Sequence, residues 1–468
     1  MPLSSPTAVA GTSAKGLRVG SRTVIRALAA FGGLAVVASL AAVPVRGTGP
    51  AAAAPPAGPG SRMVPAISMG GRPLVQTIAG PDRSGVFSCQ SAAAAEPCYG
   101  PAQIRAAYDI PRNLTGAGRT IVIIDAFKDP TIRTDLAKFD STFGLPGAAL
   151  NIICPGRHCP TLDPTNAGQV GWTDETSLDV EWAHAIAPRA TIDLVLAQSD
   201  QDADILAAQQ YVVNHNLGDV VSQSFGEGET CLVPPIRSAQ HRAFTVAERE
   251  RMTVFASAGD FGAAQGGCVG ASFFLSAGTP ASDPLVTAVG GTHLNASFTS
   301  GAYHGETVWN NSSQIPDFGA AGGGFSTVYS RPSYQNAAHT GSRFRGVPDV
   351  AYDADVYGGV LGVCSECNFG VQSFAVFGGT SAGAPQWAAI AALADQAAGH
   401  RLGLLNPALY AIAAGGRYHS AFHDVTSGNN SWDVSLFTGY QARRGWDPAS
   451  GLGSPNVARL ISLLTGRS

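Results

Sequence analysis

A serine flanked by glycines is the first feature of this sequence that could do chemistry. Ser381 lies in the stretch GGTSAGAP over 378–385, after an apolar run at 374–377 and before an alanine-rich stretch that predicts a helix over 385–398. At such a strand-to-helix turn the hydroxyl is exposed beside a helix N-terminus, whose free N–H groups favour developing negative charge. Ser381 is therefore a candidate nucleophile, and the alternative is a serine that only caps the helix.

Two acidic residues upstream stand one helical turn apart. Glu175 and Asp179 occupy positions i and i+4 of a stretch that predicts a helix over 174–186, so their side chains share a face. Like charges at this spacing destabilise a helix, whereas two close carboxyls can share a proton and serve as an acid/base pair below neutral pH. A solvated acidic face is the ordinary alternative, but Leu178 and Trp182 near this face favour burial.

A third carboxylate follows another apolar run. Asp260 lies in SAGDFG over 257–262, directly after a strand predicted at 252–257. An aspartate on such a glycine turn commonly makes an Asx-turn. In its protonated form it could instead donate a hydrogen bond to an oxyanion.

The serine motif also fits the G-x-S-x-G turn of esterases. That fold requires an acid and a histidine downstream of the serine, and His419, His423 and Asp424 are available. A secreted binding or structural protein on an inactive peptidase scaffold is an alternative of another class. Both alternatives stand beside the peptidase hypothesis at this point.

The elements that would position these residues alternate along the chain. Short apolar runs predict strands, and the stretches between several of them predict amphipathic helices. Such alternation is typical of an α/β fold with a mostly parallel central sheet and helices on both faces, in which active sites collect at the carboxyl ends of the strands. The predicted strands are 120–125, 191–197, 219–223, 252–257 and 285–289, and the predicted helices are 130–143, 174–186, 202–214 and 235–251.

The N-terminal part of the chain has a different composition. Three arginines, at 18, 22 and 26, precede an apolar stretch over 27–45 and a run of alanines at 51–54. This pattern predicts a signal peptide over 1–54, with an uncleaved signal anchor as the alternative. Residues 55–95 are rich in Ala, Pro and Gly and predict a linker or a short pro-segment, which leaves 96–468 as the catalytic domain.

The eight cysteines suit an exported protein. An even number in such a chain predicts disulfides, and local pairing gives 89–98, 154–159, 231–268 and 364–367. The pair at 364 and 367 has C-x-x-C spacing, which is also typical of half a zinc site or of a redox motif. The sequence offers no matching second half, so we expect a disulfide.

Taken together and in this order, the motifs resemble those of the sedolisin family, the serine-carboxyl peptidases with a subtilisin-like fold. The resemblance runs from about residue 99 to the C-terminus. It includes an E-x-x-x-D helix at Glu175 and Asp179, an S-x-G-D turn ending at Asp260, and a G-T-S-x-x-x-P turn around Ser381, with the segments TPAS at 279–282 and VGGT at 289–292 between them.

The resemblance implies a role for each of these residues. Ser381 would attack the peptide carbonyl, Glu175 would take its proton and later protonate the leaving amine, Asp179 would orient Glu175, and Asp260 would donate to the oxyanion. All four positions of the family pattern are kept, which is not expected of an inactive copy. The implied protein is a secreted endopeptidase with an acidic optimum that acts on polypeptides.

The resemblance also implies one structural calcium ion near the C-terminus. Its ligands would be the side chains of Asp424 and Asp447 and the carbonyls of Val425 and Gly445, hard oxygen donors of the kind Ca²⁺ prefers. Where the family usually has a further ligating glycine, this sequence has Arg443. A pair of Asx-turns without metal is the alternative.

Family members usually carry a large N-terminal pro-domain. Here the catalytic domain begins at CYGPAQI over 98–104, too early for one, so we expect none. The formal net charge of −4 gives no electrostatic reason to expect nucleic acid as a partner. We expect a monomer with no stable membrane association once the signal is cleaved.

Overall fold

A computed structural model describes residues 62–466, with gaps at 66–67, 70–71, 74, 92–93, 95–96, 269–271, 314–318 and 433–436. The predicted export signal at 1–54 lies outside these residues. No helix in the described part of the chain combines the length and the apolar character that crossing a bilayer requires.

The centre of the fold is an eight-stranded sheet in the order β16-β15-β11-β9-β6-β8-β7, with β19 paired to β15. All neighbours are parallel except the edge pair β15 and β16, which confirms the predicted mostly parallel sheet. The strands are β6 (Thr120–Ala126), β7 (Ala149–Ile153), β8 (Thr191–Ala197), β9 (Val220–Ser222), β11 (Thr253–Ser257), β15 (Thr287–Ala296), β16 (Tyr303–Val308) and β19 (Val350–Asp353).

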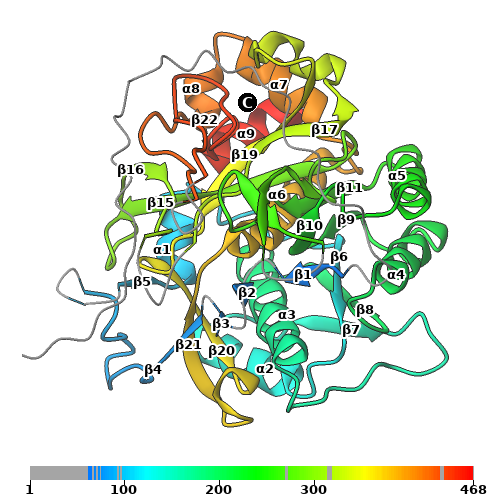
Figure 1. Ribbon diagram of the computed structural model, residues 1–468. Helices are drawn as coiled ribbons and strands as arrows, with labels where there is room; N and C mark the ends of the chain where they lie inside the picture. The colour runs from blue at the N-terminus through cyan, green and yellow to red at the C-terminus, as the bar shows by residue number, and fades with distance from the viewer. Residues whose placement is uncertain are drawn as a thin grey trace, which may run out of the picture. The chain divides into compact units, whose positions relative to one another are not determined.

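Helices cover both faces of this sheet (Figure 1). Helices α3 (Ala167–Ile186) and α6 (Gly383–Ala398) pack on one face, and α4 (Asp202–Asn214) and α5 (Pro234–Arg249) pack on the other. Strand β6 illustrates why both faces need helices. Its residues Ile121 and Ile123 pack in the core under α3 and α6. The alternating residues Val122 and Ile124 pack in the core under α4 and α5. Alternate apolar side chains on a strand point to opposite faces, so both faces must be covered.

Several predicted boundaries agree with the structure, and others differ for local reasons. The predicted spans of β8 and α4 are confirmed. Helix α3 begins seven residues before the predicted start, since Asn166 caps it by accepting hydrogen bonds from the N–H groups of Gly168 and Gln169. Strand β15 extends to Ala296 because β16 pairs with its second half.

A second sheet leads to the serine turn. Its order is β4-β21-β20-β5, from β4 (Val75–Ile78), β5 (Cys98–Tyr99), β20 (Gly359–Cys364) and β21 (Ser373–Phe377). The predicted strand before Ser381 is therefore half of an antiparallel β20–β21 hairpin outside the central sheet. Within the predicted linker, two strands pair with the rest of the folded unit, since β4 pairs with β21, and β1 (Val64–Pro65) pairs with β10 (Phe225–Gly228).

The predicted disulfide pairing is confirmed at all four places, Cys89–Cys98, Cys154–Cys159, Cys231–Cys268 and Cys364–Cys367.

The remaining helices are α1 (Pro101–Ala107), α2 (Ile132–Phe143), α7 (Asn406–Ala414), α8 (Tyr418–Ala421) and α9 (Val457–Thr465), with short 3-10 turns η1 (Ser333–Ala338), η2 (Glu366–Asn368) and η3 (Thr380–Ala382). The remaining strands are β2 (Ser68–Met69), β3 (Arg72–Pro73), β12 (Ala264–Gly266), β13 (Phe273–Leu275), β14 (Gly278–Thr279), β17 (Gly324–Ser330), β18 (Phe344–Val347), β22 (Phe422–His423) and β23 (Ser454–Pro455).

Candidate active site

Ser381 sits on a tight turn between β21 and α6. The turn begins at Gly379, whose φ of 88° lies in the left-handed region that favours glycine, and whose N–H donates to the carbonyl of Ala354 at 2.6 Å. The 3-10 turn η3 then carries Ser381 directly into α6. This confirms the predicted strand-to-helix turn and fixes the direction of the hydroxyl.

Helix α3 brings Glu175 to this hydroxyl. Ser381 Oγ lies 3.0 Å from Glu175 Oε2 and 3.4 Å from the carbonyl oxygen of Ser224, and all three residues are buried. In the described part of the chain these are the acceptors of the serine hydroxyl. His423, the histidine of the esterase alternative, instead stacks on Tyr303 with ring centroids 4.0 Å apart.

Asp179 completes a buried acidic pair one turn further along α3. Its Oδ1 accepts a hydrogen bond from the hydroxyl of Ser224 at 2.7 Å, and its side chain is hydrogen-bonded to Glu175. Two carboxyl groups can hydrogen-bond each other only when one carries a proton. Burial, with the nearby charge of Asp125, raises the pKa of Asp179 well above its usual value, which keeps that proton in place.

Two residues that sequence reasoning missed belong to the same cluster. Asp125 is the penultimate residue of β6 and lies on the α3 side of the sheet, and burial raises the pKa of its carboxyl to about 7. Ser224, two residues after β9, contacts both Asp179 and Ser381. Each directly follows, or ends, a predicted strand, so a polar residue at the carboxyl end of an apolar run was the available signal.

Asp260 lies on the other side of the serine turn. The backbone reaches it through Gly259, whose φ is 105°, and Asp260 Oδ1 accepts hydrogen bonds of 2.8 Å from both the N–H and the hydroxyl of Thr380. Asp260 Oδ2 is buried and has no hydrogen-bond partner among the described residues. Burial raises the pKa of Asp260 to about 7, so a protonated Oδ2 has a donor to offer.

The predicted calcium ligands gather around one turn. Asp424 Oδ1 accepts from the N–H of Gly445 at 3.0 Å, and Asp447 Oδ2 accepts from the N–H of Arg443 at 2.9 Å. Neither carboxylate has an ion-pair partner in the described part of the chain. Val425 is buried, and no donor among the described residues reaches its carbonyl or that of Gly445.

Both carboxylates are hydrogen-bonded, since Asp424 Oδ1 also accepts from the hydroxyl of Tyr418 at 3.1 Å and Asp447 Oδ1 accepts from the N–H groups of Ala449 and Ser450 at 2.9 Å. Carboxylate and carbonyl oxygens are nevertheless donors of the kind that a hard cation prefers. Arg443 is not among the described residues with positive φ, so its carbonyl is available to a ligand without the conformation that glycine alone favours. The structure links Asp424 to Gly445 and Asp447 to Arg443 through these hydrogen bonds.

Comparison with known proteins agrees with this geometry. The sequence profile of the Subtilase family matches residues 165–408, a span that includes Glu175, Asp260 and Ser381. Kumamolisin from Bacillus sp. (strain MN-32) is 36% identical over 392 residues, covering 81% of this chain and 66% of that protein. Sedolisin from Pseudomonas sp. (strain 101) is 30% identical over 414 residues, covering 86% of this chain and 65% of that protein.

The solved structure of Pseudomonas sedolisin, a serine-carboxyl proteinase, in complex with pseudo-iodotyrostatin matches with a TM-score of 0.69 at 29% identity, over 80% of this chain and 99% of that chain. Fold and site therefore define a subtilase in which carboxylates accompany the serine. More particularly, the chain belongs to the sedolisin family of serine-carboxyl peptidases. It spans just under two thirds of the length of these two curated relatives.

The buried acids make a prediction about stability. Burial raises the pKa values of Asp125 and Asp174 to about 7 and that of Asp129 to about 6, whereas an aspartate in the unfolded chain titrates near ~3.9. Between these values the folded state binds more protons than the unfolded state. The free energy of unfolding should therefore fall as pH rises from about 4 to about 7, by on the order of 4 kcal/mol for each carboxyl whose pKa reaches about 7.

Denaturant unfolding at a series of pH values measures this slope. Asp125→Asn, which cannot ionise, should make the slope shallower. A wild-type free energy of unfolding that is constant or rises over this pH range would contradict the prediction.

Proposed function

We propose that the protein hydrolyses peptide bonds at acidic pH with Ser381 as nucleophile. The observation that carries the proposal is the 3.0 Å contact between Ser381 Oγ and Glu175 Oε2, within a buried group that also holds Asp179. A serine hydroxyl is a weak nucleophile and needs an adjacent base, and Glu175 stands where that base is required. His423 lies elsewhere, so the esterase hypothesis has no histidine to offer Ser381.

The steps follow from the geometry. Ser381 Oγ bonds to the carbonyl carbon while its proton moves to Glu175 Oε2. As the tetrahedral intermediate collapses, Glu175 returns the proton to the leaving amine, and the acyl group remains on Ser381. Water then attacks the acyl carbon with Glu175 again as base, which releases the acid and restores the serine. Asp179, fixed by the hydroxyl of Ser224, keeps Glu175 oriented throughout.

Asp260 supplies the oxyanion contact. Its Oδ1 is held by Thr380, the neighbour of Ser381, so the second oxygen is fixed close to the reacting carbonyl. A protonated Oδ2 donates to the negative charge that develops there, whereas an ionised one repels it. The mechanism therefore needs Asp260 protonated and Glu175 able to accept a proton.

A segment of the chain itself indicates how a peptide would lie. Strand β1 runs antiparallel to β10, with Val64 opposite Gly226 and Pro65 opposite Phe225, and the N–H of Met63 donates to the carbonyl of Asp200 at 3.0 Å. Val64 and Pro65 also line the small pocket beside Asp260. An extended segment between two chain edges, next to Ser224 and Asp260, is the arrangement that strand addition gives a bound peptide.

We propose on this basis that residues 55–95 include a short pro-segment rather than a passive linker. Active protein should then show a new N-terminus shortly after Pro65, and Ser381→Ala protein should keep the segment. N-terminal sequencing of both purified proteins distinguishes the two roles, because an uncut wild-type chain with full activity would exclude the pro-segment.

We further propose that the protein is exported, acts as a monomer and binds one calcium ion through Asp424, Val425, Gly445 and Asp447. The four disulfides support export, since they persist in oxidising environments. The ion would hold the turn at 443–447 against Asp424 and takes no part in the peptide chemistry.

Removing the base tests the mechanism most directly. Glu175→Gln should lower kcat by ~10²–10⁴-fold, because the amide cannot accept the serine proton. The matched control is Glu181→Gln on the same helix, since Glu181 accepts a hydrogen bond from the N–H of Val363 at 2.9 Å and an amide oxygen can take over this role. Digestion of a peptide library at acidic pH gives both rates, and equal rates for Glu175→Gln and wild type would reject the role of Glu175.

The pH profile tests Asp260. Activity should be present at acidic pH and decline as pH rises through about 7, where Asp260 loses its proton. Asp260→Ala should lower kcat by ~10²–10³-fold, the usual cost of a lost oxyanion donor. Asp260→Asn keeps a permanent donor, so it should be slower than wild type but lose the alkaline decline. An unchanged decline in Asp260→Asn would assign it to another group.

Chelation tests the calcium ion. A ligand that binds only the folded state stabilises it by ~2.7 kcal/mol at a hundredfold excess over its Kd. A chelator should therefore lower the Tm of the wild type and leave the Tm of Asp424→Asn almost unchanged. A wild-type Tm that does not respond to chelator or to added calcium would count against the site.

A further inference from the structure

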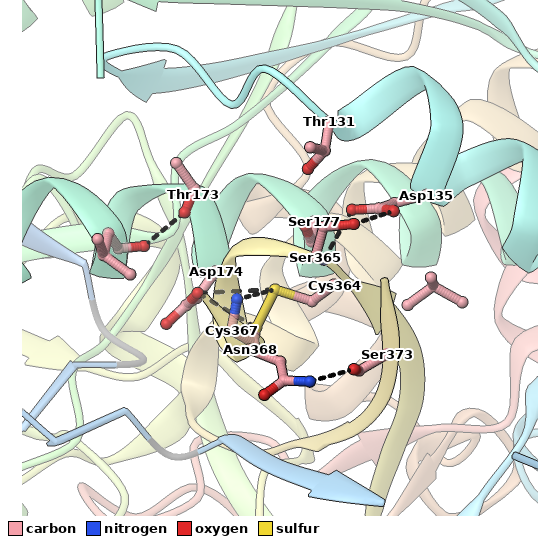
Figure 2. The surroundings of a disulfide bond; sticks show 12 residues. Thr131, Asp135, Thr173, Asp174, Ser177, Cys364, Ser365, Cys367, Asn368 and Ser373 are labelled. Carbon is pink, nitrogen blue, oxygen red and sulfur yellow. Dashed lines mark hydrogen bonds between the residues drawn. A yellow bond between two sulfur atoms is a disulfide. The ribbon is translucent and has the colours of Figure 1, made fainter. Parts of the chain in front are cut away.

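The disulfide between Cys364 and Cys367 lies against a buried carboxyl of the catalytic helix. Figure 2 shows Asp174 of α3 pointing at the disulfide, with its Oδ1 3.1 Å from Cys367 Sγ and 3.6 Å from Cys364 Sγ. The sequence predicted a disulfide here, and half a zinc site was the alternative suggested by the C-x-x-C spacing, with no second half in the sequence. The structure supplies a third ligand atom from another element, since one atom from each of these three residues lies within 4.8 Å of the others.

The mechanism gives Asp174 no task. It is buried, and it forms no ion pair in the described part of the chain. The charged groups that act on it, Asp129 and Glu366, are both acidic. A buried carboxylate among acidic neighbours lacks a compensating positive charge. A bound cation would supply that charge.

The loop that carries the two cysteines is held in place by contacts other than the disulfide. Ser365, between them, donates from its N–H and its hydroxyl to Asp135 at 2.8 and 2.7 Å. Asn368 donates to the hydroxyl of Ser373 at 2.7 Å, and Cys364 is paired with Ser373 in the β20–β21 hairpin. Figure 2 shows these contacts around the sulfur atoms. The sulfurs would therefore stay close to Asp174 if the bond between them were broken.

The surroundings also suit thiolates and a reductant. The N–H of Cys367 points at Cys364 Sγ at 3.0 Å, a contact that favours negative charge on this sulfur. Cys367 is only partly buried and lines a pocket together with Asp174, Val170 and Gly171. A dithiol can approach Cys367 from this pocket, and the same space leaves room for water as a fourth ligand.

We propose that the reduced form of this loop is a binding site for a thiophilic divalent cation such as Zn²⁺, with Cys364, Cys367 and Asp174 as ligands. A dithiol thiolate attacks Cys367 Sγ, and Cys364 leaves as a thiolate. The second thiol of the reductant then displaces Cys367, so the reductant closes to a cyclic disulfide and two electrons enter the protein. The cation replaces the protons of both thiols and any proton on Asp174. Two sulfurs, one carboxylate oxygen and a water complete the tetrahedral set that zinc prefers.

Bound metal would tie α3 to the β20–β21 hairpin at the residue next to Glu175. Metal bound to the reduced loop would then change the peptidase activity. Metal would have no effect on the activity of the oxidised protein. This consequence rests on the proposed peptidase function. The binding site itself does not, so metal binding is measured independently of activity.

The test uses the full chain, reduced with a dithiol under anaerobic conditions, freed of reductant and titrated with Co²⁺. Reduced wild type should show thiolate-to-cobalt charge-transfer absorption that saturates at one equivalent and disappears when Zn²⁺ is added. The oxidised protein should show none. The variant Cys364→Ser/Cys367→Ser should lose the absorption, whereas the matched control Cys154→Ser/Cys159→Ser, which removes another closely spaced disulfide, should keep it.

Asp174→Asn tests the third ligand and should weaken Co²⁺ binding at least ~10-fold. Circular dichroism of the oxidised variant checks that it folds, and Asp174→Glu, which restores a carboxylate, should recover part of the affinity. The absence of charge-transfer absorption in reduced wild type, its persistence in Cys364→Ser/Cys367→Ser, or an unchanged Kd in Asp174→Asn would each overturn the proposal. Inhibition of the reduced enzyme by Zn²⁺ then tests the link to catalysis separately.

Discussion

The structure depends on one constraint, the burial of helix α3 from Gly171 to its C-terminal end. Every residue from Gly171 to Ile186 is buried, yet this stretch carries Asp174, Glu175, Asp179 and Glu181. Burying an unpaired charge costs several kcal/mol, so each carboxyl must keep a proton or find a donor. Glu181 accepts a hydrogen bond from the N–H of Val363, and Asp179 accepts one from the hydroxyl of Ser224. Glu175 accepts a hydrogen bond from the hydroxyl of Ser381, so the contact that satisfies its buried oxygen is also the one that would activate the serine in the proposed mechanism.

The buried acids of α3 meet partners that come from two different sheets. The central sheet holds α3 and α6 on one face and delivers Asp125, Ser224 and Asp260 at the carboxyl ends of its strands. The second sheet positions Ser381 through the β20–β21 hairpin and the turn at Gly379. Because Thr380 of the turn donates two hydrogen bonds to Asp260, the proposed nucleophile and the proposed oxyanion donor are positioned as one unit.

The sequence was sufficient for the features that depend on local pattern. The parallel sheet, the serine turn and the disulfide pairs follow from alternating apolar runs, glycine positions and cysteine spacing. Sequence reasoning missed Ser224 and Asp125 because their importance comes from which strands become neighbours of β6. It also interpreted residues 55–95 as a linker or a short pro-segment and predicted no strand there, since two-residue strands such as β1 carry no periodic signal and are fixed only by pairing with β10.

Neighbouring positions on α3 illustrate how one helix can serve separate chemistries. Consecutive helical residues point about 100° apart, so Glu175 reaches the serine turn while Asp174 reaches the hairpin tip. On an exposed helix only one of these faces would be desolvated. On α3 both faces are buried, so ionising either carboxyl costs free energy. Each acid therefore needs a partner from a different element. The hairpin that carries Cys364 at one end leads, through β21, to Ser381. Contacts on the two faces of α3 are therefore joined through one continuous stretch of chain, which connects the disulfide loop to the turn that carries Ser381.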